Sequence, residues 1–327
     1  MKILILSDLE WNKESKQVSD EDIDTFPITK DFSSEEHRLI FRSMKYRTFW
    51  RYRSIIEDAK PDVLLLAGDI TGDGSCGHGF HKPLFLLLRY LESNKIMTFF
   101  IGGNHDDPKY FKYILERTKK YKYVKYIAGE VIDFKGIKIL GLDFEDTFNK
   151  TRLKSFLSKN YALDIVLSHC HLHRRAWLFD FNTKYVITGH WDQNIGQVDN
   201  KIFISLVNDT PEDINYVTIE LNKEHELITY YNFNSIIYKI KNHKALKKGK
   251  TFDYKPNSSK LTNTEFCDAV ILMRKAKMMG IHKMSQIEKE QLEWIINPAF
   301  SKIFFTDYLG VKELEMSDGF GLKLKKH

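Results

Sequence analysis

Short apolar runs alternate with polar, glycine-containing segments through the first 230 residues. Each run is apolar at nearly every position, as in a strand that is buried on both faces of a sheet. Most of the runs end in a turn that carries glycine, carboxylate or imidazole groups. We therefore expect buried strands at residues 2–7, 62–69, 95–101, 163–168 and 184–188.

Segments with helical patterns lie between these runs. Ser33 or Ser34 can cap a first helix that continues to about Ala59, where Pro61 stops it. Further helices are expected near 83–93, 108–118 and 151–160, and further strands near 124–134, 137–142, 201–207 and 214–231. Strands that alternate with helices predict an α/β fold with helices covering the sheet.

The texture of the sequence changes at about Lys239. We expect a first domain over residues 1–238, a lysine-rich linker over 239–255 and a small helical region over 256–327. Within the last region, helices are expected to about Met279 and near 284–296, and Pro298 closes the second one. We find no catalytic signature there.

Composition excludes some classes of protein. Hydrophobic residues make up 43% of the chain and charged residues 29%, as is ordinary for a globular protein. No apolar run approaches the roughly 18 residues of a membrane span, and the apolar N-terminal stretch is too short for a signal peptide. Three cysteines without metal-knuckle spacing fit a reducing compartment, so we expect a cytoplasmic protein without a membrane anchor.

The net charge of +6 is concentrated in the C-terminal part. From Ser235 onward there are 18 basic and 10 acidic residues, and the stretch from Lys239 to Lys260 holds eight lysines and one acid. A basic stretch beside a folded core attracts polyanions such as nucleic acid. A solvated linker explains the same lysines equally well.

Polar side chains capable of binding metal follow the predicted strands. Asp8, Asp69, Asn104, His169 and His190 each come at the carboxyl end of one. In open α/β sheets ligands bind at this edge. Each residue alone would be uninformative, but together they supply the oxygen and nitrogen ligands of a metal cluster.

The motifs around these residues resemble those of the calcineurin-like metallophosphoesterase family. The chain shows Asp8-Leu-Glu10, Gly68-Asp69, Gly103-Asn104-His105-Asp106, Ser168-His169 and Gly189-His190-Trp191-Asp192. The resemblance covers roughly residues 1–232. It implies a sandwich of mixed β-sheets flanked by helices, and a phosphate ester as substrate.

The resemblance also implies a ligand set for two divalent metal ions. Asp69 would bridge the ions, Asn104, His169 and His190 would complete the ligand set of the second ion, and Asp8 would bind the first ion. Glu10 and Asp192 stand where the family has histidines, and both would be ligands of the first ion. Carboxylates favour hard cations, so Mn²⁺ is the first candidate, with Mg²⁺, Fe or Zn²⁺ as alternatives. A weak or empty first site is the other interpretation.

The expected reaction is hydrolysis of a phosphate ester by metal-activated hydroxide. His105 is the candidate acid for the leaving group, oriented by Asp106 or Asp73; alternatively, His105 only hydrogen-bonds a phosphate oxygen. Candidate phosphate contacts are His78, His81, His171 and Arg174. All four also suit solvated loops.

Three alternatives remain for the function. The lysine-rich stretch and the aromatic content favour a phosphodiester of a nucleotide or nucleic acid, since bases stack on aromatic rings. A phosphomonoesterase or a protein phosphatase is the second enzyme class. The two substituted ligands motivate the third alternative, a binding or scaffold protein that keeps the fold with weakened catalysis.

Overall fold

The structure is a computed structural model of the 327-residue chain. It describes residues 1–9, 47–71, 81–147, 149–159, 161–170, 176–190, 194–208, 214–232, 235–241, 244–248, 271–272, 275–276, 278–280, 283–289, 314–317 and 321–324.

The first sheet has eight strands in the order β14-β13-β12-β11-β1-β2-β3-β4. Its centre is parallel: β1 (Lys2–Leu6), β2 (Val63–Ala67), β3 (Met97–Ile101) and β4 (Val124–Tyr126) run in one direction. An antiparallel extension follows, made of β11 (Asn215–Leu221), β12 (Glu226–Asn232), β13 (Ser235–Lys241) and β14 (Lys244–Lys248). The sheet is therefore mixed.

The second sheet has six strands in the order β5-β6-β7-β8-β10-β9. The strands β6 (Ile137–Leu142), β7 (Leu163–His169), β8 (Thr183–Gly189) and β10 (Lys201–Ser205) are parallel neighbours. The edges, β5 (Val131–Phe134) and β9 (Asn194–Val198), are antiparallel to their partners.

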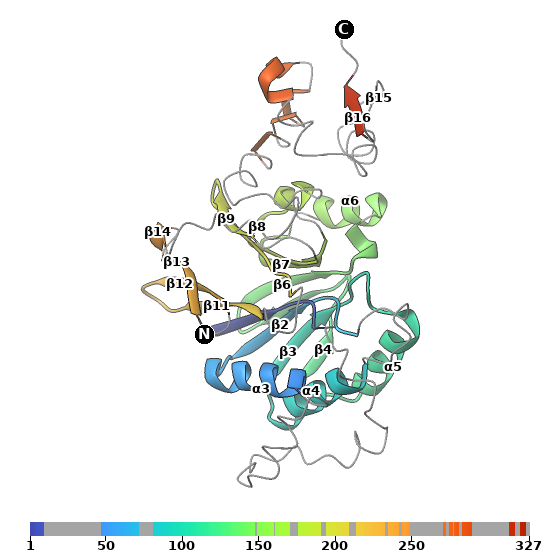
Figure 1. The fold of residues 1–327 in the computed structure, drawn as a ribbon, viewed down its shortest axis with the longest axis vertical. Coiled ribbons are helices and arrows are strands. Elements are labelled where there is room, and N and C mark those ends of the chain that lie inside the picture. Colours follow the sequence, from blue (N-terminus) through green and yellow to red (C-terminus); the bar gives the residue numbers. More distant parts are fainter. Residues whose placement is uncertain are drawn as a thin grey trace.

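The two sheets pack face to face with helices on the outside (Figure 1). Alternate residues of both sheets, such as Ile5, Leu65, Ile165 and Ile187, form one buried cluster between them. The other face of the first sheet packs on α3 (Arg47–Ala59), α4 (His81–Ser93) and α5 (Pro108–Thr118), and α6 (Lys150–Ser158) lies beyond the second sheet. Both faces of the central strands are covered, which explains their uninterrupted apolar runs.

The predicted α/β sandwich of mixed sheets flanked by helices is confirmed. The structure divides two predicted segments: 124–134 becomes β4 and β5, which lie in different sheets, and 214–231 becomes the hairpin of β11 and β12. The first predicted helix is described only from Arg47 onward, as α3.

The domain boundaries stay a prediction, but the paired strands are informative. The strands β13 and β14 continue the first sheet to Lys248, inside the segment predicted as a linker. In the predicted helical region, β15 (Leu314–Ser317) and β16 (Gly321–Leu324) form a two-stranded sheet, and residues 271–272, 275–276, 278–279 and 286–289 are helical. Among the described helices, none is long and apolar enough to span a bilayer.

Candidate metal centre

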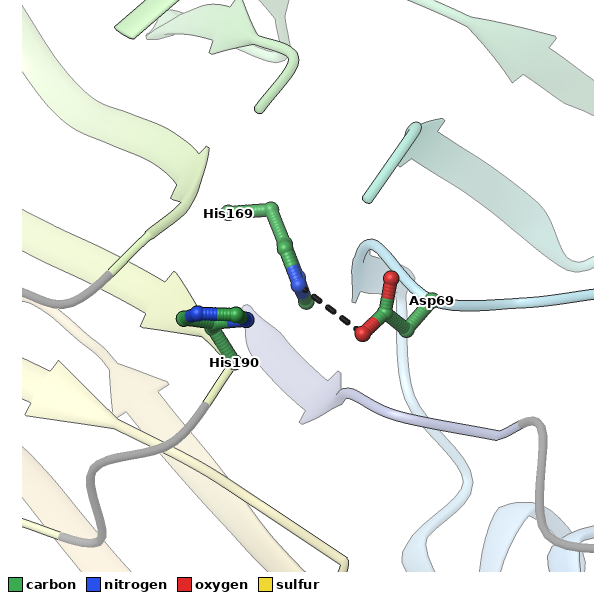
Figure 2. Close-up of side chains that lie close together, drawn as sticks. All are labelled: Asp69, His169 and His190. Carbon is green, nitrogen blue, oxygen red and sulfur yellow. Dashed lines mark ion pairs between the residues drawn. The ribbon is translucent and has the colours of Figure 1, made fainter. Parts of the chain in front are cut away.

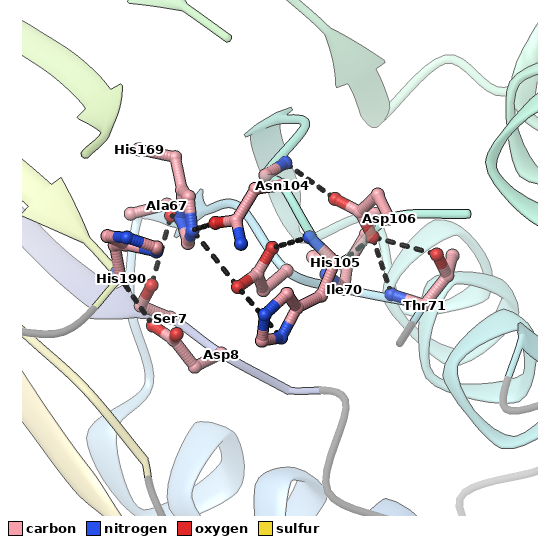
Figure 3. Close-up of polar contacts among 12 residues, drawn as sticks. Ser7, Asp8, Ala67, Ile70, Thr71, Asn104, His105, Asp106, His169 and His190 are labelled. Carbon is pink, nitrogen blue, oxygen red and sulfur yellow. Dashed lines mark hydrogen bonds and ion pairs between the residues drawn. The ribbon is translucent and has the colours of Figure 1, made fainter. Parts of the chain in front are cut away.

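The carboxyl ends of strands from both sheets meet at one edge of the sandwich (Figure 3). Asp8 follows β1, Asp69 follows β2, Asn104 follows β3, His169 ends β7 and His190 follows β8. The Ala67 carbonyl oxygen ties the sheets together here, because it accepts a hydrogen bond from His169 Nδ1 of the second sheet at 2.6 Å, and it also accepts the Ser7 hydroxyl of its own sheet at 3.0 Å. Five separate segments thus deliver polar side chains to one place.

Glycines make this convergence sterically feasible. A Cβ on Gly189 would lie 2.0 Å from Ser7 Oγ and 2.2 Å from the Ala67 oxygen. A Cβ on Gly103 would lie 2.4 Å from the backbone nitrogen of Asp69, and one on Gly68 would lie 2.4 Å from His169 Nδ1. The glycines of the three motifs are therefore needed because backbone and ligand side chains approach them closely.

Three of the candidate ligands have a left-handed backbone. The φ angles are 54° at Asp8, 50° at Asp69 and 90° at His190. Non-glycine residues adopt positive φ uncommonly, although Asp and His tolerate it better than most. Backbone strain of this kind clusters at active sites and ligand clamps.

The centre of the site is the triad Asp69, His169 and His190, whose ligand atoms all lie within 4.8 Å of one another (Figure 2). Asp69 Oδ2 lies 3.0 Å from His169 Nε2, and Asp69 Oδ1 accepts the backbone N–H of His105 at 2.8 Å. Asn104 Oδ1 lies 3.1 Å from the same Nε2. Asp69 and His169 are almost fully buried.

Hydrogen bonding fixes which nitrogen of His169 is free to bind metal. The Ala67 carbonyl oxygen can only accept, so Nδ1 carries a proton. In neutral His169, Nε2 therefore presents a lone pair toward two further acceptors, Asp69 Oδ2 and Asn104 Oδ1. Three acceptors that face one another need a positive partner, and a divalent cation fits that need.

Without a cation, a proton takes this place. Burial lowers the pKa of His169, but the Asp69 carboxylate outweighs burial, and the pKa rises to about 10. Burial raises the pKa of Asp69. The charge of His169 and its hydrogen bond together lower this pKa by more than burial raises it, so the net shift is downward. The pair is therefore an ionised carboxylate against an imidazolium.

Asp106 connects the β2 and β3 loops (Figure 3). Its Oδ1 accepts from the backbone N–H groups of Ile70 and Thr71 at 2.8 and 2.7 Å and from the Thr71 hydroxyl at 2.8 Å. Its Oδ2 accepts the N–H of Gly103 at 2.7 Å. Burial and the nearby Asp69 raise the pKa of Asp106 to about 7. These contacts make Asp106 a clamp between the two ligand-bearing loops.

Two residues that the sequence analysis missed follow β6. Asp143 Oδ1 accepts the N–H of Gly102 at 2.6 Å, and its Oδ2 is hydrogen-bonded to the hydroxyl of Tyr126. The ring of Phe144 lies 5.4 Å from that of His190 and 6.2 Å from that of His169, centroid to centroid. Asp143 could have been found, because it follows a buried strand just as Asp8 and Asp69 do.

Asp8 lies at the same edge, where its Oδ2 accepts the backbone N–H of His190 at 3.2 Å. The predicted ligands Asp8, Asp69, Asn104, His169 and His190, together with His105, are thus gathered in one place. Glu10, Asp73, Asp192, His78, His171 and Arg174 lie outside the described residues. His81 is the first residue of α4, and its side chain also lies outside the description.

Solved structures with a similar fold are distant in sequence. TT1561 of Thermus thermophilus is 12% identical, with a TM-score of 0.45, over 71% of this chain and 98% of its own. Vps29 from Entamoeba histolytica, complexed with Zn²⁺, is 14% identical, with a TM-score of 0.36, over 74% and 98%. Chaetomium thermophilum Vps29 is 11% identical, with a TM-score of 0.36, over 74% and 96%.

Comparison with curated proteins gives no match. The family model for calcineurin-like phosphoesterases does match, over residues 1–193, which contain Asp8, Asp69, Asn104, His169 and His190. The resemblance inferred from the motifs is thereby confirmed: the chain belongs to the calcineurin-like phosphoesterase family.

Proposed function

We propose that the protein is a metal-dependent phosphoesterase that uses two divalent cations, with Mn²⁺ as the first candidate. The observation that carries this proposal is the convergence of Asp69, His169 and His190 within 4.8 Å, with Asn104 Oδ1 against the same imidazole nitrogen. Hydrophobic packing alone does not require buried Asp69 and His169 to face each other and two further acceptors. Membership of the phosphoesterase family supports the same conclusion.

In the proposed ligand set, Asp69, Asn104, His169 and His190 hold one cation. Asp8, with Glu10 and Asp192, holds the other, and Asp69 is shared. When bound, the cations supply positive charge to the phosphoryl oxygens and acidify a water molecule. The chain's own residues fix the ligand geometry: the Ala67 carbonyl sets the His169 tautomer, and Asp106 holds the Asp69 and Asn104 loops together.

His105 is the proposed proton donor to the leaving alkoxide. Its ring is half exposed at the centre, with Nδ1 3.7 Å from Asp69 Oδ2. The backbone N–H of His105 is fixed on Asp69 Oδ1, so the residue moves with the ligand loop. Because both carboxylate oxygens of Asp106 bind loop N–H groups, we assign Asp106 to holding the loop rather than to proton transfer.

For the substrate we favour a phosphodiester of a nucleotide or nucleic acid, with His78, His81, His171 and Arg174 as proposed phosphate contacts. The basic stretch after Ser235 supports this preference, because it attracts polyanions. A phosphomonoester or a phosphoprotein is the alternative within the enzyme class. A screen of monoesters, cyclic nucleotides, DNA and RNA separates these substrates.

The decisive test compares hydrolysis of bis(p-nitrophenyl) phosphate with Mn²⁺ by wild type and by Asn104→Ala. Loss of the Asn104 ligand should lower kcat/KM about 100-fold or more and reduce the bound Mn²⁺ per chain. The matched control is Asn182→Ala, which lies exposed before β8, at the end of that strand opposite His190. Equal background rates in all three proteins would refute the enzyme and favour the binding protein.

A further inference from the structure

We propose that Phe144 is a specificity-determining residue that contacts an aromatic group in the organic part of the substrate. This proposal rests on the proposed function, because it places the organic part of the ester beside the metal ligands. It adds a substrate class: phosphate esters or phosphonates that carry an aromatic ring are preferred over those with a small alkyl group.

The first support is the position of the ring. Phe144 follows β6 and lies against both imidazoles of the metal triad, 5.4 Å from His190 and 6.2 Å from His169. The ring offers no ligand atom, and it is only partly buried beside a charged, polar centre. The Phe144 ring is therefore a side-chain neighbour of the place where the triad would hold a phosphoryl group.

The second support is that the backbone of Phe144 is held on both sides. Its N–H donates to the Gly102 carbonyl at 3.2 Å. Its own carbonyl accepts from the N–H of Thr147 at 3.1 Å and from the Thr147 hydroxyl at 2.5 Å. A side chain on a fixed backbone loses little further freedom when a ligand binds, so its contacts contribute more fully to affinity.

The third support is that this turn is attached to the loop that carries Asn104. Asp143 Oδ1 accepts the N–H of Gly102, and the Phe144 N–H returns a bond to the Gly102 carbonyl. The position of the ring and the position of the ligand loop are therefore set together. An aromatic ring fixed relative to a metal ligand can discriminate between substituents on phosphorus.

A competing role for Phe144 is packing against His169 and His190, which would stabilise the metal site for every ligand alike. Equilibrium binding of two phosphonates separates the roles without relying on turnover. Phenylphosphonate and methylphosphonate present the same anionic group to the cations, and they differ in whether a ring is attached to phosphorus. If Phe144 only packs against the histidines, its removal should weaken the binding of both phosphonates equally.

The experiment measures the affinity of both phosphonates by calorimetry on Mn²⁺-loaded protein. Phe144→Ala removes the ring, and Phe144→Leu keeps apolar volume against the histidines while removing the aromatic face. The control is Phe134→Ala, which removes a similarly half-buried ring that packs on Phe99 at the opposite end of β5 and β6. Mn²⁺ binding is measured on each variant first.

The proposal expects both Phe144 variants to bind phenylphosphonate about three- to ten-fold more weakly, the range for loss of one aromatic pair. Methylphosphonate affinity should change less than about two-fold, and Phe134→Ala should match wild type. If the Phe144 variants bound both phosphonates equally more weakly, or bound both as well as wild type does, the role of Phe144 would be overturned and the phosphoesterase proposal would stay intact. Failure of wild type to bind either phosphonate would overturn both proposals.

Discussion

Substitution of Gly189 by alanine tests how tightly the two sheets meet at the candidate metal centre. The new Cβ would lie 2.0 Å from Ser7 Oγ, 2.2 Å from the Ala67 oxygen and 2.7 Å from His169 Nδ1. An ordinary carbon–oxygen contact needs more than about 3 Å, so the Ala67 carbonyl must move by about 1 Å. That movement breaks its bonds with Ser7 and His169.

Overpacking of this kind costs about 1–3 kcal/mol, and each lost hydrogen bond about 1 kcal/mol. We therefore expect Gly189→Ala to lower the free energy of unfolding by about 3–5 kcal/mol and to weaken Mn²⁺ binding. Urea denaturation of metal-free protein measures the first quantity, and calorimetry the second.

The matched control is Gly136→Ala. Gly136 has a φ of +86° but nothing within 4 Å of a Cβ, so this variant measures backbone strain alone, about 1–2 kcal/mol. If the two variants were equally stable and bound Mn²⁺ equally, the argument from close approach at Gly189 would be wrong.

Three further predictions follow from the site. Asp106→Ala leaves the N–H groups of Ile70, Thr71 and Gly103 without their acceptor and should destabilise the fold by about 3 kcal/mol. The control, Asp133→Ala at an exposed carboxylate, should cost less than about 1 kcal/mol. Similar urea midpoints for the two variants would contradict the role of Asp106 as a clamp. Because burial and Asp69 raise the pKa of Asp106 to about 7, the folded state keeps a proton that the unfolded state loses above its ordinary pKa of 3.8. The stability of metal-free protein should therefore fall as pH rises from about 4 to 7, with Asp106 contributing up to about 1.4 kcal/mol per pH unit. Asp106→Asn should lack this contribution. If stability depended on pH in the same way in wild type and Asp106→Asn, the contribution of Asp106 would be excluded. Because Asp69 raises the pKa of His169 to about 10, Mn²⁺ binding at about pH 7.5 should release about one proton from Nε2. Calorimetry in buffers of different ionisation enthalpy measures this release, and heats that do not depend on the buffer would count against it.

The sequence predicts the central strands well because each is a short apolar run with both faces buried. The runs at β1, β2, β3, β7 and β8 carry enough signal to locate the polar residues at their carboxyl ends. That register is what brings Asp8, Asp69 and His169 to one edge. The motifs add the family, because Gly-Asn-His-Asp after a buried strand is an uncommon combination.

Weaker patterns escape sequence analysis for physical reasons. The strands β13 and β14 are rich in lysine, so their composition resembles a linker; they are strands because β13 pairs with β12 and β14 pairs with β13. The strand β9 is short and mixed in polarity. The position of Asp106 in the motif favours a catalytic role, but a motif does not reveal which way a carboxylate points. In the structure this carboxylate accepts hydrogen bonds from loop N–H groups. Phe144 gives no signal, since an aromatic residue after a strand is usually packing.

The left-handed backbone at Asp8, Asp69 and His190 has a consequence for how variants of this protein would be ranked. Glycine in place of Asp69 would relax the main chain, but it would also remove the acceptor of the His105 N–H and the buried partner of His169. Glycine in place of His190, whose side chain is only half-buried, relieves the strain with less to oppose it. A selection for protease resistance should therefore tolerate glycine in place of His190 better than in place of Asp69, whereas a selection for bound Mn²⁺ should discard both. Deep mutational scans under the two pressures should disagree most at His190, and such disagreement would mark the centre without any assay of turnover.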